Sequence, residues 1–76
     1  MTSNQVIEAV FELDGDGEFD GDRDTTSAAI ANHIGGSVVD AITLCVELEK
    51  KGQIRDGGWG WVLTDAGMKV MEVITA

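Results

Sequence analysis

One stretch, Ser37 to Lys51, constrains the fold of this chain more than any other, because both of its ends carry helix signals. Gly35-Gly36 precedes it, and Ser37 is a good N-cap residue whose hydroxyl can accept an orphan backbone N–H. Lys50-Lys51 suits the negative end of a helix dipole, and Gly52 can adopt the left-handed C′ conformation. The stretch is therefore predicted to be a helix of about four turns.

Two apolar lines run along this predicted helix. The first has the i, i+4, i+7 spacing of a core-facing stripe and consists of Ala41, Cys45 and Leu48. The second has i, i+4, i+8 spacing and consists of Val38, Ile42 and Val46. A helix that is apolar on more than one side is usually buried on more than one side, and a chain of 76 residues has little protein to cover both. The second line is therefore a candidate contact surface.

Two further helices are expected before this stretch. The first covers about Gln5 to Leu13 and is capped by Ser3 or Asn4. Its apolar face has i, i+3, i+4, i+7 spacing and consists of Val6, Ile7, Val10, Phe11 and Leu13. The second covers about Ser27 to Ile34, after several cap residues at 24–27. Its apolar face consists of Ala28, Ile30, Ala31 and Ile34.

A two-stranded hairpin and a last helix are expected after Gly52. Gln53 to Arg55 is the first strand, and Trp59 to Leu63 is the return strand. Asp56-Gly57-Gly58 is the predicted turn, because Asp-Gly accepts the positive φ angles of primed turns. Thr64 caps a helix from Asp65 to Ile74, which packs through Val70, Met71, Val73 and Ile74. The predicted fold class is mostly α with a small β-hairpin, in one domain over residues 1–76.

This order of elements resembles the winged helix-turn-helix superfamily from Thr25 to Met71, about two-thirds of the chain. Three segments carry the likeness: Ala29-Ile30-Ala31, Leu48-Glu49-Lys50-Lys51-Gly52-Gln53-Ile54 and Trp61-Val62-Leu63-Thr64-Asp65-Ala66-Gly67. The resemblance implies a three-helix core, a two-stranded wing and a C-terminal helix. It also implies a third helix of the kind that many members place in the DNA major groove.

The groove-facing positions depart from the DNA-reading pattern. On this alignment they are Ser37, Val38, Val39, Asp40, Ile42 and Thr43. None is Arg, Lys, Asn or Gln, the side chains that usually read base edges. The nearest cations, Lys50, Lys51 and Arg55, would neutralise about three phosphates, against roughly six to ten in a typical protein–DNA contact. Direct DNA binding is therefore disfavoured. The alternative is a dimeric DNA-binding transcriptional regulator that uses Ser37, Thr43, Lys50, Lys51 and Arg55.

The charge of the chain limits its partners. It has 5 Lys and Arg against 14 Asp and Glu, a formal net charge of −9 at pH 7. Such a charge repels phosphate backbones and anionic lipid, and it attracts basic proteins or divalent cations. The alternative is that the acidity only keeps the protein soluble or reflects a salt-loving source. Segment 14–24 carries six acids and one Arg, −6 + 1 = −5, so the rest of the chain still carries −4.

The acidic segment Asp14 to Asp24 resembles the calcium loop of EF-hand proteins, in which hard oxygen ligands alternate. Gly21 takes position 6, and the candidate ligands are Asp16, Glu18, Asp20, Asp22 and Asp24. Position 12, where a bidentate Glu is expected, is Ser27. The pattern therefore predicts at best a weak calcium-binding module, with a dissociation constant on the order of 0.1–1 mM. A solvated loop is the alternative interpretation.

No catalytic arrangement is visible in the sequence, so neither an enzyme nor a cofactor is expected. Cys45 is expected to be a buried structural thiol, and His33 a surface residue near a helix C-terminus. One His with one Cys does not make a zinc site, and one cysteine rules out an internal disulfide. The sequence shows no secretory signal and no apolar run of about 18 residues. A cytoplasmic protein is therefore expected.

The preferred hypothesis is a small acidic winged-helix regulatory protein that acts through protein–protein contact. The predicted partner-binding residues are Val38, Asp40, Ile42, Val46 and Trp59. The partner is either a second copy of the chain or a basic nucleic-acid-handling protein that the chain would bind or inhibit. In one form of the second hypothesis, the acidic side chains of the chain mimic a nucleic acid. Trp59 and Trp61 point to the same side of their strand, so Trp59 either covers the core or anchors the interface.

Overall fold

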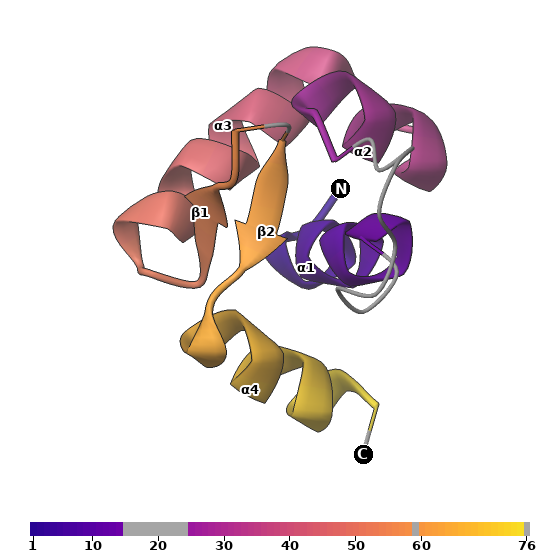
Figure 1. The fold of residues 1–76 in the computed structure, drawn as a ribbon. Helices are drawn as coiled ribbons and strands as arrows, with labels where there is room; N and C mark the ends of the chain where they lie inside the picture. The colour runs from indigo at the N-terminus through magenta and orange to yellow at the C-terminus, as the bar shows by residue number, and fades with distance from the viewer. Residues whose placement is uncertain (15–24, 59, 76) are drawn as a thin grey trace.

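The computed structural model describes residues 1–14, 25–58 and 60–75 of the chain. In these ranges the chain forms four helices and one antiparallel pair of strands (Figure 1). The helices are α1 (Ser3–Asp14), α2 (Ser27–Ile34), α3 (Val38–Lys50) and α4 (Asp65–Ile74). The strands are β1 (Ile54–Asp56) and β2 (Trp61–Leu63). The expected class, mostly helical with a small hairpin, is confirmed.

Helix α1 is the element on which the others assemble. It packs against α2, α3, α4 and β2 and lies near the middle of the molecule in Figure 1. Helix α3 runs along one edge, with α1, α2 and β1 in contact with it. Helix α4 contacts α1 and β2 and lies at the opposite end of the molecule from α2. Because α3 lies at an edge, one of its two apolar lines faces the other elements and the second does not.

The N-cap of α1 is Thr2, so the prediction of Ser3 or Asn4 is wrong. Thr2 Oγ1 accepts a hydrogen bond from the Gln5 backbone N–H at 3.2 Å. Gln5 Oε1 in turn accepts from the Thr2 backbone N–H at 2.8 Å. This reciprocal pair is a capping box, which satisfies two orphan donors at once. A cap at Ser3 or Asn4 would lack the Gln5 half of the pair.

The turn between α2 and α3 forms as its glycines predict. Gly35 has a φ of +86°, and the N–H groups of Gly35 and Gly36 both donate to the Ala31 carbonyl, at 2.8 and 2.9 Å. Ser37 then caps α3 by accepting from the Val39 N–H at 3.2 Å. The axes of α2 and α3 differ by 115°. This sharp turn sends α3 across α1 instead of continuing the line of α2.

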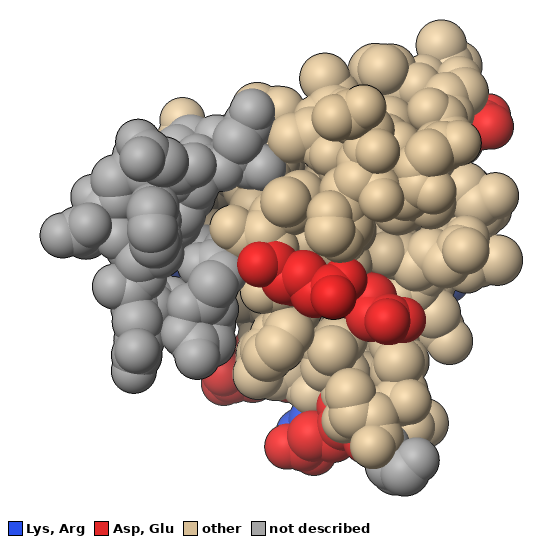
Figure 2. Space-filling view, turned by 90° about the vertical axis from the view of Figure 1, so that its right-hand side faces the viewer, with Lys and Arg blue, Asp and Glu red and all other residues tan. Residues whose placement is uncertain are grey.

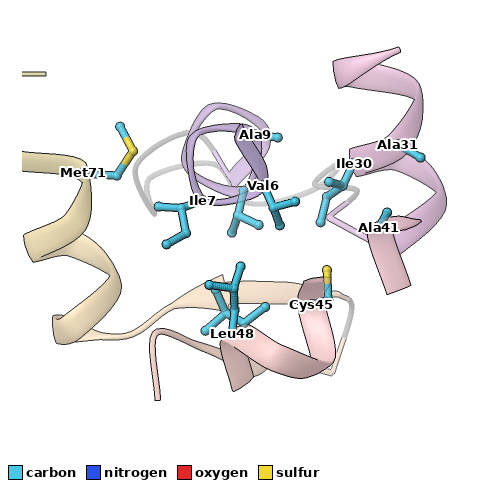
Figure 3. Close-up of a cluster of buried hydrophobic side chains, with 11 residues drawn as sticks. Val6, Ile7, Ala9, Ile30, Ala31, Ala41, Cys45, Leu48 and Met71 are labelled. Atoms are coloured by element: carbon cyan, nitrogen blue, oxygen red, sulfur yellow. The ribbon is translucent and has the colours of Figure 1, made fainter. Parts of the chain in front are cut away.

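The core lies where α1, α2 and α3 meet, and Met71 of α4 joins it from the other end (Figure 3). Leu48 of α3 and Ile7 of α1 point into the same space. The buried members of the cluster are Val6, Ile7, Ala9, Val10, Ile30, Ala31, Ala41, Cys45, Leu48, Ile54 and Met71. The predicted core face of α3 is therefore confirmed.

Two apolar residues predicted to face the core are exposed. The core-facing line of α4 has i, i+3, i+4, i+7 spacing at Gly67, Val70, Met71 and Ile74. Val73 falls outside that spacing and is 77% exposed. Ala28 is exposed on α2 because Ile30 and Ala31 form the buried side of that short helix. Both errors come from counting every apolar residue of a helix as part of one face.

The hairpin is shorter than predicted, and β1 is shifted by one residue. Its register pairs Ile54 with Leu63, Arg55 with Val62 and Asp56 with Trp61. Asp56 is therefore a strand residue and not the first turn residue. Its Oδ1 accepts from the Gly58 N–H at 2.8 Å, an Asx-type contact, and the Gly57 N–H donates to the Gly60 carbonyl at 2.8 Å. The connection thus runs from Gly57 to Gly60.

Thr25 joins α2 to the hairpin. It is fully buried and forms a parallel bridge with Gly60, and the Trp61 N–H donates to the Thr25 carbonyl at 3.0 Å. Gly60 has a φ of +153°, and a Cβ at this position would lie 2.7 Å from the Thr25 carbonyl carbon. Only glycine permits such a close approach of two backbones. The start of α2 is thereby held against the second strand.

Candidate functional site

Four aliphatic side chains on the outer side of α3 are exposed to solvent. Their exposed fractions are 45% for Val38, 70% for Val39, 48% for Ile42 and 39% for Val46. We call these four residues the α3 patch. An adjoining side of the helix, centred about 110° away around the axis, carries Ala41, Cys45 and Leu48, each fully buried. The second apolar line of α3 is therefore exposed, and it is wider than the sequence analysis predicted.

Val39 is the member of the α3 patch that the sequence analysis left out. It lies three residues before Ile42 and seven before Val46, and both spacings place side chains on the same side of a helix. The sequence contains this spacing, but Val39 does not belong to the i, i+4, i+8 line formed by Val38, Ile42 and Val46. With Val39 included, the apolar surface spans more than a single row of side chains.

Asp40, predicted to bind the partner, lies on the exposed surface of α3 but away from the α3 patch. At 3.6 residues per turn, its direction differs from the centre of the patch by about 145° around the helix. It lies in the first turn of α3, where the positive end of the helix dipole stabilises a carboxylate. A partner seated on the α3 patch alone does not reach Asp40.

The residues named for DNA contact are spread over the start, the middle and the end of α3 and over β1. Two of them use their hydroxyls locally: Ser37, the N-cap, accepts from the Val39 N–H at 3.2 Å, and Thr43, in the middle of the helix, donates from Oγ1 to the Val39 carbonyl at 3.0 Å. At the far end, Lys50, Lys51 and Arg55 are exposed. Within residues 1–14, 25–58 and 60–75, no carboxylate forms an ion pair with these three cations. Lys50 ends α3, Lys51 is its C-cap, and Arg55 is the central residue of β1.

Comparison of the chain with protein-family models, with curated proteins and with solved structures gives no match. Function is therefore inferred from the exposed and buried side chains of this chain alone. Among the described helices, none is by itself long and apolar enough to cross a membrane. Helices α2 and α3 have that length and composition only when taken together, across their 115° bend.

An acidic depression lies between α1 and α2, and the sequence analysis did not predict it. It has a volume of about 260 Å³ and is lined by Gln5, Glu8, Glu12, His33 and Ile34. His33 Nε2 lies 3.1 Å from Glu12 Oε1, which joins the two helices at the surface. In the part of the chain that the structure describes, no group of three His, Cys, Asp or Glu side chains is placed to hold a metal ion. The contact between His33 and Glu12 depends on how α1 and α2 pack together, and short-range sequence patterns do not predict that packing.

Cys45 lies next to the polar contact that joins the hairpin to α2. Ser27 Oγ accepts from Trp61 Nε1 at 3.2 Å, and the Cys45 thiol hydrogen-bonds to the Ser27 side chain. Burial raises the pKa of Cys45, and the hydrogen bond to Ser27 offsets part of that rise. A fully buried thiol with a raised pKa has neither the access nor the thiolate character of a nucleophile. The predicted burial of Cys45 is confirmed.

We expect Cys45 to react with a thiol reagent only when the protein unfolds. Because its folded-state pKa is raised, the thiol contributes stability that is complete below about pH 8.5 and is lost as pH rises through the folded pKa. Urea unfolding should therefore give a lower free energy at high pH than at neutral pH, and Cys45→Ala should reduce the difference. Labelling of Cys45 in native buffer at the rate of a free thiol would contradict the expected protection of this side chain in the folded protein.

Two predicted sets lie outside the described residues. The first is the calcium set, Asp16, Glu18, Asp20, Asp22 and Asp24. The second is Trp59, the predicted interface anchor. Its neighbour Trp61 is half-buried and packs against the core. The interface proposed below therefore depends on α3 alone.

Proposed function

We propose that this chain is a small acidic winged-helix regulatory protein that acts through protein–protein contact and not through direct DNA readout. The α3 patch is the observation that carries the proposal. On the winged-helix alignment, Val38, Val39 and Ile42 occupy positions where a DNA-reading helix carries hydrogen-bonding side chains. Exposed aliphatic side chains in a cluster are typical of surfaces that bind other proteins.

The geometry of α2 and α3 supports the winged-helix part of the proposal. Three residues, Gly35 to Ser37, separate the two helices, and their axes differ by 115°. Helix-turn-helix units have an angle of about 90–120° and a turn of three or four residues that often contains glycine. A two-stranded hairpin and then α4 follow α3, which is the order expected of a wing and a C-terminal helix.

Charge supports protein contact over DNA contact. Lys50, Lys51 and Arg55 could neutralise about three phosphates. The logarithm of the DNA-binding constant would then fall with the logarithm of the salt concentration with a slope of about −2.7. A fourfold rise in salt would then weaken binding by roughly 40-fold. The net charge of −9 adds repulsion to this small attraction. A dimeric DNA-binding regulator would double the number of contacts and remains the alternative function.

Two kinds of partner are compatible with the proposal. One is a second copy of the chain, joined through the α3 patch. The other is a basic nucleic-acid-handling protein, which the acidic surface would attract. Figure 2 shows a face on which the Asp and Glu atoms clearly outnumber the Lys and Arg atoms. Such a face suits the mimic form of the proposal, in which carboxylates take the place of phosphates in the partner's groove.

We expect Val39→Asp to reduce partner binding at least tenfold while leaving the fold intact. The new carboxylate would have to lose its water in an apolar interface, which is strongly unfavourable. Its effect on α3 is small, because the first turn of a helix favours a negative charge. The control is Val73→Asp on α4, since the two valines are 70% and 77% exposed and receive the same charge. Val73 is in the last turn of α4, where the helix dipole disfavours a carboxylate, so circular dichroism first checks that the control variant is folded. Proteins retained from an extract of the source cells by each immobilised variant, quantified by mass spectrometry, give the comparison.

Equal retention by the parent chain, Val39→Asp and Val73→Asp would exclude the α3 patch as the contact surface. A second measurement addresses DNA directly. Fluorescence anisotropy with a generic duplex at roughly 50 mM salt should show no binding up to about 100 μM protein. Binding at micromolar protein that falls steeply with salt, and that weakens when Lys50 and Arg55 are replaced by Ala, would favour the DNA-binding regulator.

A further inference from the structure

Three residues of the α3 patch, Val38, Ile42 and Val46, are spaced symmetrically along the helix. Val38 and Val46 lie four residues on either side of Ile42, and all three are exposed on one line of α3. If two copies of α3 lie antiparallel with the axis at Ile42, Val38 of each copy faces Val46 of the other. A contact in which the same patch serves both partners is the usual arrangement of a two-fold dimer. The apolar line is about 12 Å long, enough for two turns of helix against helix.

Charge distinguishes between the two kinds of partner at this surface. Residues 37–56 carry four acids and three cations, −4 + 3 = −1, so the rest of the chain carries −9 − (−1) = −8. Three of the chain's five Lys and Arg residues are Lys50, Lys51 and Arg55, in or next to α3. A basic partner is attracted to the strongly acidic remainder more than to this nearly neutral part. Two copies of the chain, in contrast, repel each other less here than at the acidic segments of the chain.

The antiparallel arrangement also matches the ends of the two helices. It brings the C-terminal end of one α3 to the N-terminal end of the other, so that the two helix dipoles oppose each other. Glu49 of one copy then lies near the start of the other copy's α3, where the positive end of the dipole stabilises a carboxylate. Lys50 reaches the same end and offsets part of this effect, so the opposed helix dipoles and the apolar side chains are what favour the arrangement.

We propose that the α3 patch is the interface of a weak homodimer, in which two α3 helices pack antiparallel across Ile42. This inference rests on the proposed function. Four side chains form a patch of at most a few hundred Å², below the roughly 800 Å² per partner of a standard stable interface. The dimer is therefore concentration-dependent. Because its contact is apolar and its copies repel, association strengthens as salt screens the charges. Contact with a phosphate backbone or with a basic protein changes with salt in the opposite direction.

Sedimentation equilibrium at about 50 mM and about 500 mM salt, over a range of protein concentrations, tests the salt dependence. We expect the parent chain to shift from monomer toward dimer with concentration, and more so at high salt. Val39→Asp should stay monomeric, whereas Val73→Asp should behave as the parent chain does. A dimer that dissociates as salt rises would overturn the proposal, because its contact would be electrostatic.

Disulfide trapping tests the axis. A two-fold axis at Ile42 brings this residue next to its own copy, so Ile42→Cys should form a covalent dimer within the short Cβ–Cβ reach of a disulfide. With diamide as oxidant, two thiols lose two protons and two electrons to form one S–S bond, and diamide becomes the hydrazine. The control is Val73→Cys, an exposed position on α4, which should stay largely monomeric. The native Cys45 is buried and should not contribute.

The introduced thiol also separates this inference from the proposed function. If Ile42→Cys stays monomeric and its thiol reacts freely with a labelling reagent, the homodimer is overturned while the α3 patch remains open to a different protein. If the thiol is protected in a monomer, the patch is covered within the chain and both ideas fail. Equal cross-linking of Ile42→Cys and Val73→Cys would show random collision and would also overturn the homodimer.

Discussion

Leu48→Ala is expected to lower the free energy of unfolding by about 3–5 kcal/mol. Leu48 is fully buried, and Figure 3 shows it pointing from α3 into the space that Ile7 of α1 also enters. Removing most of its side chain leaves a cavity at the junction of α1 and α3. A domain of 76 residues has a total stability of roughly 4–11 kcal/mol, so the loss is a large fraction of the whole. Urea unfolding followed by circular dichroism measures it.

Ile42→Ala is the matched control for this prediction, because it removes a similar branched side chain from the other side of the same helix. Ile42 is 48% exposed, and its truncation should lower stability by no more than about 1 kcal/mol. The difference between the two variants reports which side of α3 faces the core. Equal losses would mean that the Ile42 side is also covered, and the α3 patch would then not be a free surface.

Gly67→Ala is expected to destabilise the protein by about 1–3 kcal/mol, the usual range for overpacking. In a helix interior, glycine to alanine normally stabilises by roughly 0.5–1 kcal/mol, so the sign here is reversed. A Cβ at Gly67 would collide with the Gln53 carbonyl oxygen and would lie 3.1 Å from Leu63 Cδ2. The same carbonyl accepts from the Thr64 N–H at 3.1 Å, so it cannot move away without weakening that bond.

Thermal unfolding measures this effect, because each kcal/mol lowers the Tm of a domain this size by about 4–8 °C. The control is Ala66→Gly at the neighbouring exposed position, where only helix propensity changes and a loss of about 1 kcal/mol or less is expected. A rise in Tm for Gly67→Ala would contradict the close packing of α4 on the Gln53 carbonyl. It would mean that α4 is held only by its apolar side chains.

Most of the helix limits could be predicted from short-range patterns. Ser37, Thr64 and Gly52 were placed correctly as two N-caps and a C′ residue, and α2 and α4 have their predicted bounds. Each of these signals acts between residues no more than about four positions apart, so the sequence holds all of the information that they need. The start of α1 differs from the prediction although its signal, the capping box of Thr2 and Gln5, is equally local.

The candidate site, in contrast, could not be predicted from short-range patterns alone. The sequence revealed two apolar lines on α3, and both had the spacing of a core face. Packing against α1 and α2 decided that Leu48 is buried and Ile42 is exposed. The acidic depression beside His33 and the demand for glycine at residue 67 likewise depend on partners that lie far away in the sequence. Helical periodicity determines which residues share a face, but burial is a property of two surfaces in contact, and the second surface comes from elsewhere in the chain.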